Sequence, residues 1–255
     1  MKVLLDCRLS DNDRLQLFLD GLSSARSAFH RAGEPFLSRI ALPVKYSTLE
    51  HNPPVFIFRF KKDGAFTPDL IAEMHAALDT IQNYAGEACL VVTGDGKVFS
   101  TGFDLEYFSA ATIDARKQLM NKSVELLDRL LDFPLPTVAA INGHAFGMGV
   151  LVALACDYRY MRADRGYLCL PEIDLKVTIP SGMMSLLKRK LVPLALRDLL
   201  LTGRRIGGKE AVRLGVVDEA CAEEEVLQKA VSRASALAAK DRETYGAMKR
   251  SLIHW

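Results

Sequence analysis

Residues Thr137 to Asp157 read TVAAINGHAFGMGVLVALACD. The apolar run from Val138 to Ile141 predicts a strand, the glycine-rich stretch from Asn142 to Gly149 predicts a turn, and Val150 to Ala155 predicts a buried helix. Glycines let a ligand come close to the backbone, and the free N–H groups at a helix start favour negative charge. This turn is therefore the first candidate for an anion or oxyanion site.

Other interpretations of this turn compete with an oxyanion site. A dinucleotide fingerprint needs Gly or Ala three residues after its second glycine, whereas Val152 stands there. A phosphate loop needs a following Gly-Lys-Ser or Gly-Lys-Thr, which this stretch does not have. A purely structural turn stays open, because glycine also permits tight packing. Only the rest of the chain can decide between them.

The composition describes an ordinary globular chain. Its 255 residues are 49% hydrophobic and 25% charged, which predicts one large domain with ample material for a core. The net charge of +2 is nearly balanced and no long basic run occurs, so we expect no nucleic-acid partner. No apolar run is long enough for a membrane span or a signal-peptide core, so we expect no membrane association.

The cysteines indicate the compartment. Their number is odd and none stands in a Cys-x-x-Cys pair, which argues against a disulfide framework and against a structural zinc site. We therefore expect no metal and a reducing, cytoplasmic environment. The C-terminal residues SLIHW do not match a peroxisomal address. The five positions are Cys7, Cys89, Cys156, Cys169 and Cys221.

The hydrophobic pattern divides the chain into an N-terminal extension (1–45, with a helix expected between Asp11 and Ala32), a core domain (46–205) and a helical C-terminal region (206–255). Strands alternate with helices in the core domain, which predicts a mainly parallel sheet covered by helices. The expected strands are Val55–Phe60, Ala88–Thr93, Val138–Ile141, Tyr158–Met161 and Tyr167–Leu170. The expected helices include one that begins at Pro68, with Thr67 as its N-cap, and runs to Ile81, followed by Thr112–Leu131, Ser181–Leu191, Ala195–Leu201, Lys209–Leu214, Glu223–Ala239 and Arg242–Ile253.

Two more segments at strand ends carry candidate chemistry. The strand ending at Thr93 leads to a second glycine-centred turn, Phe99 to Leu105, and ligands of open α/β folds gather beyond such strand ends. Asp104 in this turn has the simpler interpretation of a helix cap. Glu172 follows another strand; most glutamates are solvated, but a carboxylate held against apolar groups has a raised pKa and can act as a base.

Four motifs resemble those of the enoyl-CoA hydratase/isomerase, or crotonase, superfamily: FSTGFDL (99–105), INGHAFGMG (141–149), LPEIDLKVTIPSG (170–182) and LTGRRIGGKEAVRLGVVDEA (201–220). Their order and spacing match over residues 46–220, and the chain looks most like the Δ3,Δ2-enoyl-CoA isomerases. The resemblance implies an α/β crotonase (ClpP/crotonase-like) fold of repeated ββα units with a helical C-terminal region. It also implies a homotrimer or hexamer whose contacts that region builds.

The resemblance implies three catalytic groups: an oxyanion hole formed by the backbone N–H groups of Phe103 and Met148, and Glu172 as the base. The acyl-CoA thioester is the implied substrate, and coenzyme A is part of it rather than a cofactor. The residues implied to line the substrate site are Ala65, Phe66, Ser100, Gly102, Asp104, Leu105, Gly147, Leu151 and Leu170, with Lys249 reaching the CoA phosphates of the same or a neighbouring subunit.

Leu151 decides which reaction the resemblance implies. Hydratases of this superfamily use two glutamates, and the first position is Leu151 here whereas the second is Glu172. Adding water needs one group to activate water and one to deliver a proton. Moving a proton from C2 to C4 of a 3-enoyl thioester needs only one base and an oxyanion hole. We therefore expect an isomerase that works without a metal or a redox cofactor.

Two alternatives from different classes remain at this point. One is another acyl-CoA enzyme on the same scaffold, such as a hydratase, a thioester hydrolase or a decarboxylase. The other is a catalytically silent binding protein with the crotonase fold, which the presence of Glu172 disfavours.

Overall fold

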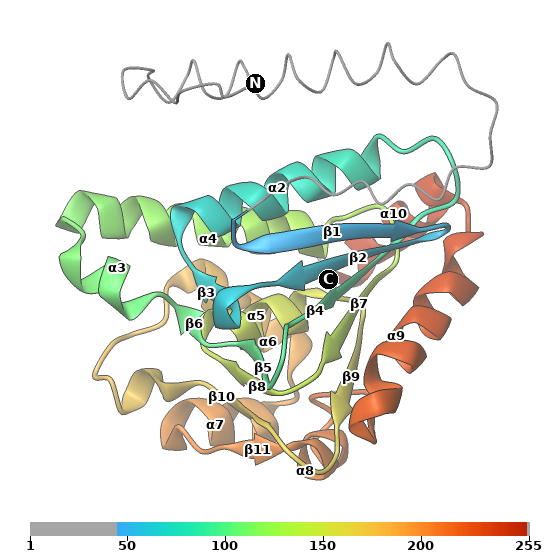
Figure 1. The fold of residues 1–255 in the computed structure, drawn as a ribbon. Coiled ribbons are helices and arrows are strands. Elements are labelled where there is room, and N and C mark those ends of the chain that lie inside the picture. Colours follow the sequence, from blue (N-terminus) through green and yellow to red (C-terminus); the bar gives the residue numbers. More distant parts are fainter. Residues whose placement is uncertain (1–44, 254–255) are drawn as a thin grey trace, which may run out of the picture. The chain divides into compact units, whose positions relative to one another are not determined.

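The computed structural model describes residues 45–253, in which strands alternate with helices (Figure 1). The first half contains β1 (Ser47–Asn52), β2 (Val55–Phe60), η1 (Lys62–Gly64), β3 (Ala65–Phe66), α2 (Pro68–Gln82), β4 (Cys89–Thr93), β5 (Val98–Ser100), β6 (Gly102–Phe103), α3 (Leu105–Ala110) and α4 (Ile113–Leu131). The second half contains β7 (Thr137–Ile141), β8 (His144–Phe146), α5 (Met148–Ala155), β9 (Tyr158–Arg162), β10 (Tyr167–Cys169), η2 (Pro171–Ile173), α6 (Ser181–Lys190), α7 (Pro193–Thr202), β11 (Ile206–Gly207), α8 (Gly208–Arg213), β12 (Glu219–Cys221), α9 (Glu223–Ala238) and α10 (Arg242–Ile253).

The main sheet has six strands in the order β1-β2-β4-β7-β9-β12. Only β1 and β2 are antiparallel, and the remaining neighbours are parallel, as the sequence predicts. The central strands β4 and β7 are apolar and buried along their whole length. Strands of this kind belong in a parallel sheet that helices cover on both faces.

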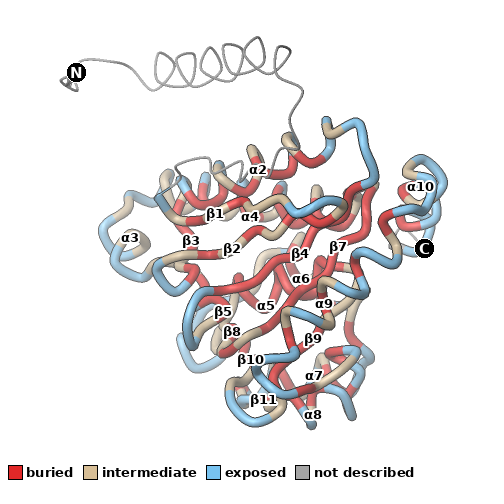
Figure 2. Tube along the Cα trace, turned by 45° about the vertical axis from the view of Figure 1, so that its right-hand side comes forward, coloured by how far each residue is buried: buried red, intermediate tan, exposed pale blue. Residues whose placement is uncertain are grey.

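Helices cover the two faces of the main sheet separately. On one face α9 packs against β4, β7 and β9 and encloses a small apolar cluster around Val91, Val138 and Ala230 (Figure 1). On the other face α2, α4 and α5 enclose the larger core, which extends to α6 and α7. The buried segments in Figure 2 follow this layering, with the central strands buried and the outer turns of α3 and α10 exposed.

A second sheet has the order β11-β10-β8-β5 and positions the candidate site. After β4, β7 and β9 the chain crosses to this sheet as β5, β8 and β10, and then continues into helical segments. The predicted ββα repeat is therefore confirmed. Because β5, β8 and β10 run parallel, their carboxyl ends lie at one edge of the second sheet.

Within residues 45–253 the predicted strands and helices are present, and their ends differ from the expected ones by at most two residues. The prediction of a plain turn from Asn142 to Gly149 is wrong, because the turn contains the strand β8. Sequence patterning also missed β1. A strand as short as β8 has no hydrophobic period of its own, and its hydrogen bonds come from β5 and β10, which are distant in the sequence.

The expected boundary at residue 205 does not separate two units, since the described residues all belong to one compact unit. β11 and β12 follow residue 205 and pair with β10 and β9, and α9 covers the main sheet. A role of this region in oligomerisation stays a prediction. The expected N-terminal helix lies outside the described residues. None of the helices between residues 45 and 253 is long and apolar enough to cross a membrane.

Candidate active site

Three strand ends of the second sheet bring the two glycine turns and Glu172 together. β5 ends at Ser100 and leads into β6, β8 ends directly before Gly147 and α5, and β10 ends two residues before η2, which carries Glu172. Parallel pairing of these strands places all three ends on one side. Segments separated by about seventy residues along the chain thus meet at the N-terminus of α5.

The N–H group of Met148 is the first candidate oxyanion donor. Gly147 precedes α5 with a φ of +44°, a conformation that favours glycine, and its own N–H donates to Cys169 O of β10 at 3.0 Å. The first helical bond of α5 runs from Leu151 N to Gly147 O at 3.2 Å. Helix geometry therefore leaves Met148 N without an intrahelical acceptor, and the helix dipole favours negative charge there.

The N–H group of Phe103 is the second candidate donor. Asp104 N donates to Phe66 O of β3 at 3.1 Å, and successive N–H groups of a strand point to opposite edges, so Phe103 N points away from β3. Gly102 lies against the other turn, since a Cβ added to it would be 3.0 Å from Phe146 O and 3.6 Å from Met148 N. The two glycine turns therefore lie against each other.

Glu172 faces this site from η2. A Cβ added to Gly147 would lie 3.3 Å from Glu172 Oε1, so the carboxylate sits directly over the turn that begins α5. Oε2 is buried and has no hydrogen-bond partner among the described residues. Burial raises the pKa of Glu172, and a smaller backbone hydrogen-bond contribution opposes this. A desolvated carboxylate with a free oxygen is well placed to accept a proton.

The substrate-lining residues implied by the resemblance have different positions. Leu151 is buried on α5, which begins at Met148, and Leu170 is buried directly before η2, which carries Glu172. Gly102 and Gly147 lie at the turns, Ala65 is half-buried on β3, and Leu105 is exposed at the start of α3. Phe66 and Ser100 are fully buried, and their part in lining the coenzyme A groove stays a prediction.

Asp104 acts as a helix cap. Its Oδ1 accepts a hydrogen bond from Tyr107 N at 2.9 Å, so it caps α3 directly after the Phe103 donor. The simpler interpretation of this residue is confirmed. Its carboxylate contributes to the site by fixing where α3 begins.

Sequence reasoning missed two features. Asn142 follows β7 and ties it to the loop between β4 and β5, since its Oδ1 accepts from Gly94 N at 2.9 Å and its Nδ2 donates to Gly96 O at 3.0 Å. Three apolar side chains after Glu172 are about half exposed: Ile173 (49%), Leu175 (55%) and Val177 (52%). The alternation of apolar and polar residues in this segment is the sequence pattern that could have predicted their exposure. These side chains present an apolar surface next to the Glu172 carboxylate.

Lys249 lies elsewhere, in the buried anchor of α10. Its Nζ pairs with Asp157 Oδ1 at 2.8 Å and donates to Thr137 Oγ1 at 3.3 Å, and the residue is 6% exposed. Tyr245, one turn earlier on α10, donates to Asp157 Oδ2 at 3.0 Å. The structure thus corrects the expectation that Lys249 reaches the CoA phosphates, because its buried ammonium pairs with the Asp157 carboxylate inside the protein.

Removing this lysine is expected to affect stability. Lys249→Met keeps the apolar length of the side chain but leaves the carboxylate of Asp157, whose side chain is 12% exposed, with only neutral hydrogen-bond donors. We expect the free energy of unfolding to fall by about 3–5 kcal/mol, since breaking a buried pair by removing one partner is costly. Chemical denaturation measures this change, and Lys240→Met, at an exposed lysine, is the matched control. A loss no larger than that of the control would contradict the anchoring role.

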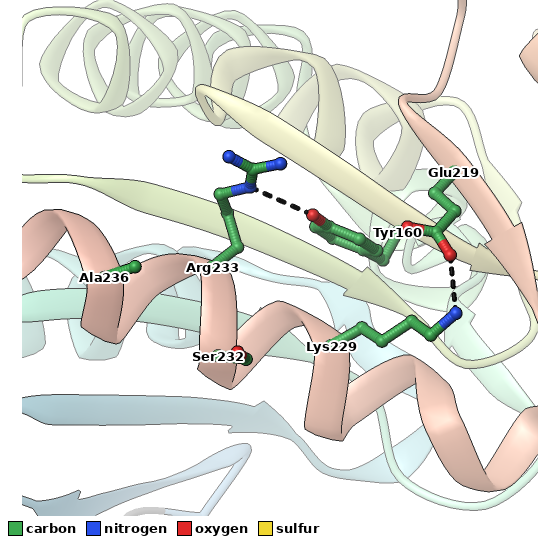
Figure 3. A pocket seen from close by; sticks show the side chains of 6 residues that line it. All are labelled: Tyr160, Glu219, Lys229, Ser232, Arg233 and Ala236. Atoms are coloured by element: carbon green, nitrogen blue, oxygen red, sulfur yellow. Dashed lines mark hydrogen bonds and ion pairs between the residues drawn. The ribbon is translucent and has the colours of Figure 1, made fainter.

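One hollow on the described surface lies away from this site. Tyr160, Glu219, Lys229, Ser232, Arg233 and Ala236 line a hollow of about 310 Å³ (Figure 3). Its charged groups already have partners, with Lys229 paired to Glu219 and Arg233 Nε donating to Tyr160 OH at 3.1 Å. It lies on the α9 face of the main sheet, whereas α5 covers the opposite face.

Two candidate N–H donors and one desolvated carboxylate at neighbouring turns fit an enzyme that moves a proton next to a carbonyl group. Residues 55–254 match the family model of enoyl-CoA hydratase/isomerase. The chain therefore belongs to the enoyl-CoA hydratase/isomerase family and has the crotonase fold.

Named relatives include isomerases and hydratases. Enoyl-CoA delta isomerase 3 of Arabidopsis thaliana is 38% identical over 216 residues, covering 80% of this chain and 91% of that protein. The peroxisomal enoyl-CoA delta isomerase 2 of the same plant is 37% identical over 218 residues, with the same coverage. The crystal structure of the enoyl-CoA hydratase EchA3 from Mycobacterium ulcerans Agy99 superposes with a TM-score of 0.76 at 27% identity, covering 82% of this chain and 91% of that one.

Proposed function

We propose that this protein is a Δ3,Δ2-enoyl-CoA isomerase with Glu172 as its only proton carrier. The observation that carries the proposal is the position of the Glu172 carboxylate over the Gly147 turn, with an unpartnered oxygen. The names of the two Arabidopsis relatives support the same reaction. The substrate is then a 3-enoyl thioester of coenzyme A.

The reaction balances with the groups of this site alone. Glu172 takes a proton from C2, and the electron pair of that C–H bond moves to the thioester oxygen, giving a dienolate. The N–H groups of Phe103 and Met148 donate to this oxyanion. The electrons then return, C4 takes the proton from Glu172, and the double bond lies between C2 and C3. No electrons leave the substrate, so the shuttle as written requires neither a metal nor a redox cofactor.

Leu151 supports isomerisation over hydration. In α5 it stands one turn after Met148 and is 2% exposed, so it offers neither a second carboxylate nor a place for a water molecule. Together with Leu170 it keeps the surroundings of the dienolate apolar. Hydrogen bonds to an oxyanion are stronger in such surroundings, and the intermediate is protected from bulk water.

The test compares two substrates with purified full-length protein. We expect ultraviolet absorbance to show conversion of 3-hexenoyl-CoA and no hydration of crotonyl-CoA. Hydration of crotonyl-CoA at a comparable rate would favour the hydratase alternative. Thioester cleavage or decarboxylation without a double-bond shift would contradict the proposal, and only the assignment to the family would remain.

Proton transfer within the site gives a second readout of the same proposal. If one desolvated carboxylate carries the proton, part of it should pass from C2 to C4 before it exchanges with solvent. With 3-hexenoyl-CoA in D₂O at low conversion, we expect product that lacks deuterium at C4, measured by mass spectrometry and NMR. Complete deuteration at C4 would contradict a water-excluding site.

A gain of function tests the role of position 151. Leu151→Glu is expected to add slow, measurable hydration of crotonyl-CoA, because it introduces the second carboxylate that hydratases use. We expect a low rate, since a buried carboxylate without hydrogen-bond partners lowers the stability of the protein and has a raised pKa, so that it stays protonated. Leu151→Gln, of the same shape but without a base, is the control. A folded Leu151→Glu variant that binds crotonyl-CoA and hydrates none of it at any pH would contradict the assigned geometry.

The proposal includes a homotrimer or hexamer, which light scattering with size-exclusion chromatography tests. The cytoplasmic location stays a prediction, and relatives named peroxisomal are known.

A further inference from the structure

Ser100 is fully buried at the meeting point of both candidate oxyanion segments. Its Oγ donates to Gly64 O at 2.6 Å and accepts from Gly102 N at 3.1 Å. The hydroxyl therefore uses its donor and an acceptor inside the protein, and has no exposed surface for a substrate. Through these two bonds it links the η1 turn to the residue that precedes the Phe103 donor.

The same side chain limits the position of α5. A Cβ added to Gly149 would lie 2.6 Å from Ser100 Cβ and 2.7 Å from Ser100 Oγ, so the first turn of α5 rests directly on Ser100. Gly149 follows Met148, whose N–H is the other donor. Ser100 thus contacts a neighbour of each donor, one by a hydrogen bond and one by close packing.

A β-bulge gives Ser100 this orientation. Along the β5–β8 pairing, Val98 lies opposite His144 and Ser100 lies opposite Ala145, so Phe99 is the additional residue. A bulge changes the direction in which the following side chain points, and bulges are common next to active sites. Phe99 enters the core, and Ser100 is directed toward α5 and Gly64.

We propose that Ser100 is a positioning residue, which sets the separation between Phe103 N and Met148 N and so the fit of the hole to the oxyanion. This inference rests on the proposed function, in which those two groups hold the dienolate oxygen. Donors to an oxyanion act through fixed geometry, so a small displacement of one donor affects the transition state more than the binding of the substrate.

The kinetic test uses Ser100→Ala, which removes both hydrogen bonds and keeps the Cβ that supports α5. We expect kcat for 3-hexenoyl-CoA to fall about 10- to 100-fold while KM changes less than about threefold. Ser123→Ala is the matched control, because Ser123 is also fully buried and its hydroxyl donates to a carbonyl, Leu119 O, within α4. We expect the control to keep wild-type kcat.

The spectroscopic test needs binding but no turnover. Two N–H donors on the carbonyl oxygen of 2,4-hexadienoyl-CoA polarise its conjugated system, so the wild type is expected to shift the absorption of the bound thioester to longer wavelength. Ser100→Ala is expected to bind it with a smaller shift, and Ser123→Ala with the full shift. Ser100→Cys, whose thiol donates weakly, is expected to fall between the wild type and Ser100→Ala in both kcat and shift.

The outcomes separate the two proposals. Wild-type kcat and a full shift in Ser100→Ala would overturn the positioning role, and so would equal losses in Ser123→Ala. If Ser100→Ala does not fold, Ser100→Cys carries the test, and wild-type values for it would overturn the role. A wild type that shifts the absorption but does not isomerise 3-hexenoyl-CoA refutes the proposed function, while a shift that shrinks in Ser100→Ala still supports the positioning role.

Discussion

Glu172→Gln is expected to lower kcat for 3-hexenoyl-CoA by about 10²–10⁴-fold, which is the usual contribution of a general base. The amide keeps the shape of the side chain over the Gly147 turn but cannot accept the C2 proton. Binding of acyl-CoA should stay within about threefold, since no binding group is lost. Steady-state kinetics and titration with a saturated acyl-CoA measure both. Retention of more than a few per cent of kcat would show that another group carries the proton.

The same residue predicts a pH dependence. Burial raises the pKa of Glu172 above its ordinary value of 4.5, and the base must be ionised to react. We therefore expect kcat/KM to fall as the pH drops through this raised pKa, with the acid limb above pH 4.5. A profile that stays level down to pH 4.5 would contradict the burial of the base.

The contribution of Glu172 to stability should have the opposite pH dependence: it becomes less favourable as the pH rises. Because the pKa of Glu172 is higher in the folded than in the unfolded chain, folding favours the protonated form, and the ionised form costs stability above that pKa. Glu172→Gln is expected to stabilise the protein at neutral pH, and this gain should disappear as the pH falls toward the ordinary value of the unfolded chain. Denaturation at several pH values measures it, and an unchanged gain at low pH would contradict the cause.

Met148→Pro is expected to lower kcat by about 10²–10³-fold or more, the cost of losing one oxyanion donor. Proline lacks the N–H group, and it is tolerated at the first position of a helix, which Met148 occupies in α5. The substitution also removes a side chain that is 1% exposed, so we expect lower stability.

Met148→Leu is the matched control for this variant, because it keeps the N–H group and nearly the same volume at a cost usually below about 1.5 kcal/mol. We expect it to retain most of kcat, while Met148→Pro loses the absorption shift of bound 2,4-hexadienoyl-CoA. Equal kcat values for the two folded variants would show that Met148 N is not a donor of the oxyanion hole.

The local sequence pattern is enough to predict a strand or a helix where the segment itself shows the hydrophobic period of that element. The strand Val55–Phe60 and the helix Arg242–Ile253 are confirmed to the residue, because alternation and helical spacing act within a few neighbours. The two glycine turns are equally visible, since glycine marks where backbone comes close to other groups. The resemblance then assigned Glu172 and the two donors to one site, and the structure brings them to one side of the second sheet.

Other residues could not be assigned from local pattern. Lys249 looks like any lysine of an amphipathic helix, and only the fold places Asp157 next to it. Ser100 stands in a motif that resembles substrate-lining segments, yet the bulge at Phe99 directs its side chain toward the protein interior. In both cases the partner is more than 30 residues away in the sequence, as the Ser100–Gly64 hydrogen bond shows.

The sequence by itself determined the mainly parallel α/β architecture, the two glycine turns, the candidate base at Glu172 and the apolar residue at position 151. Tertiary structure alone decided that β8 exists, that the C-terminal region completes both sheets, and that Ser100 and Lys249 are buried. The physical reason is the range of the interactions. Periodicity and turn chemistry act between neighbours in the chain, whereas desolvation and hydrogen bonding of a side chain depend on which distant segments the parallel strands bring together.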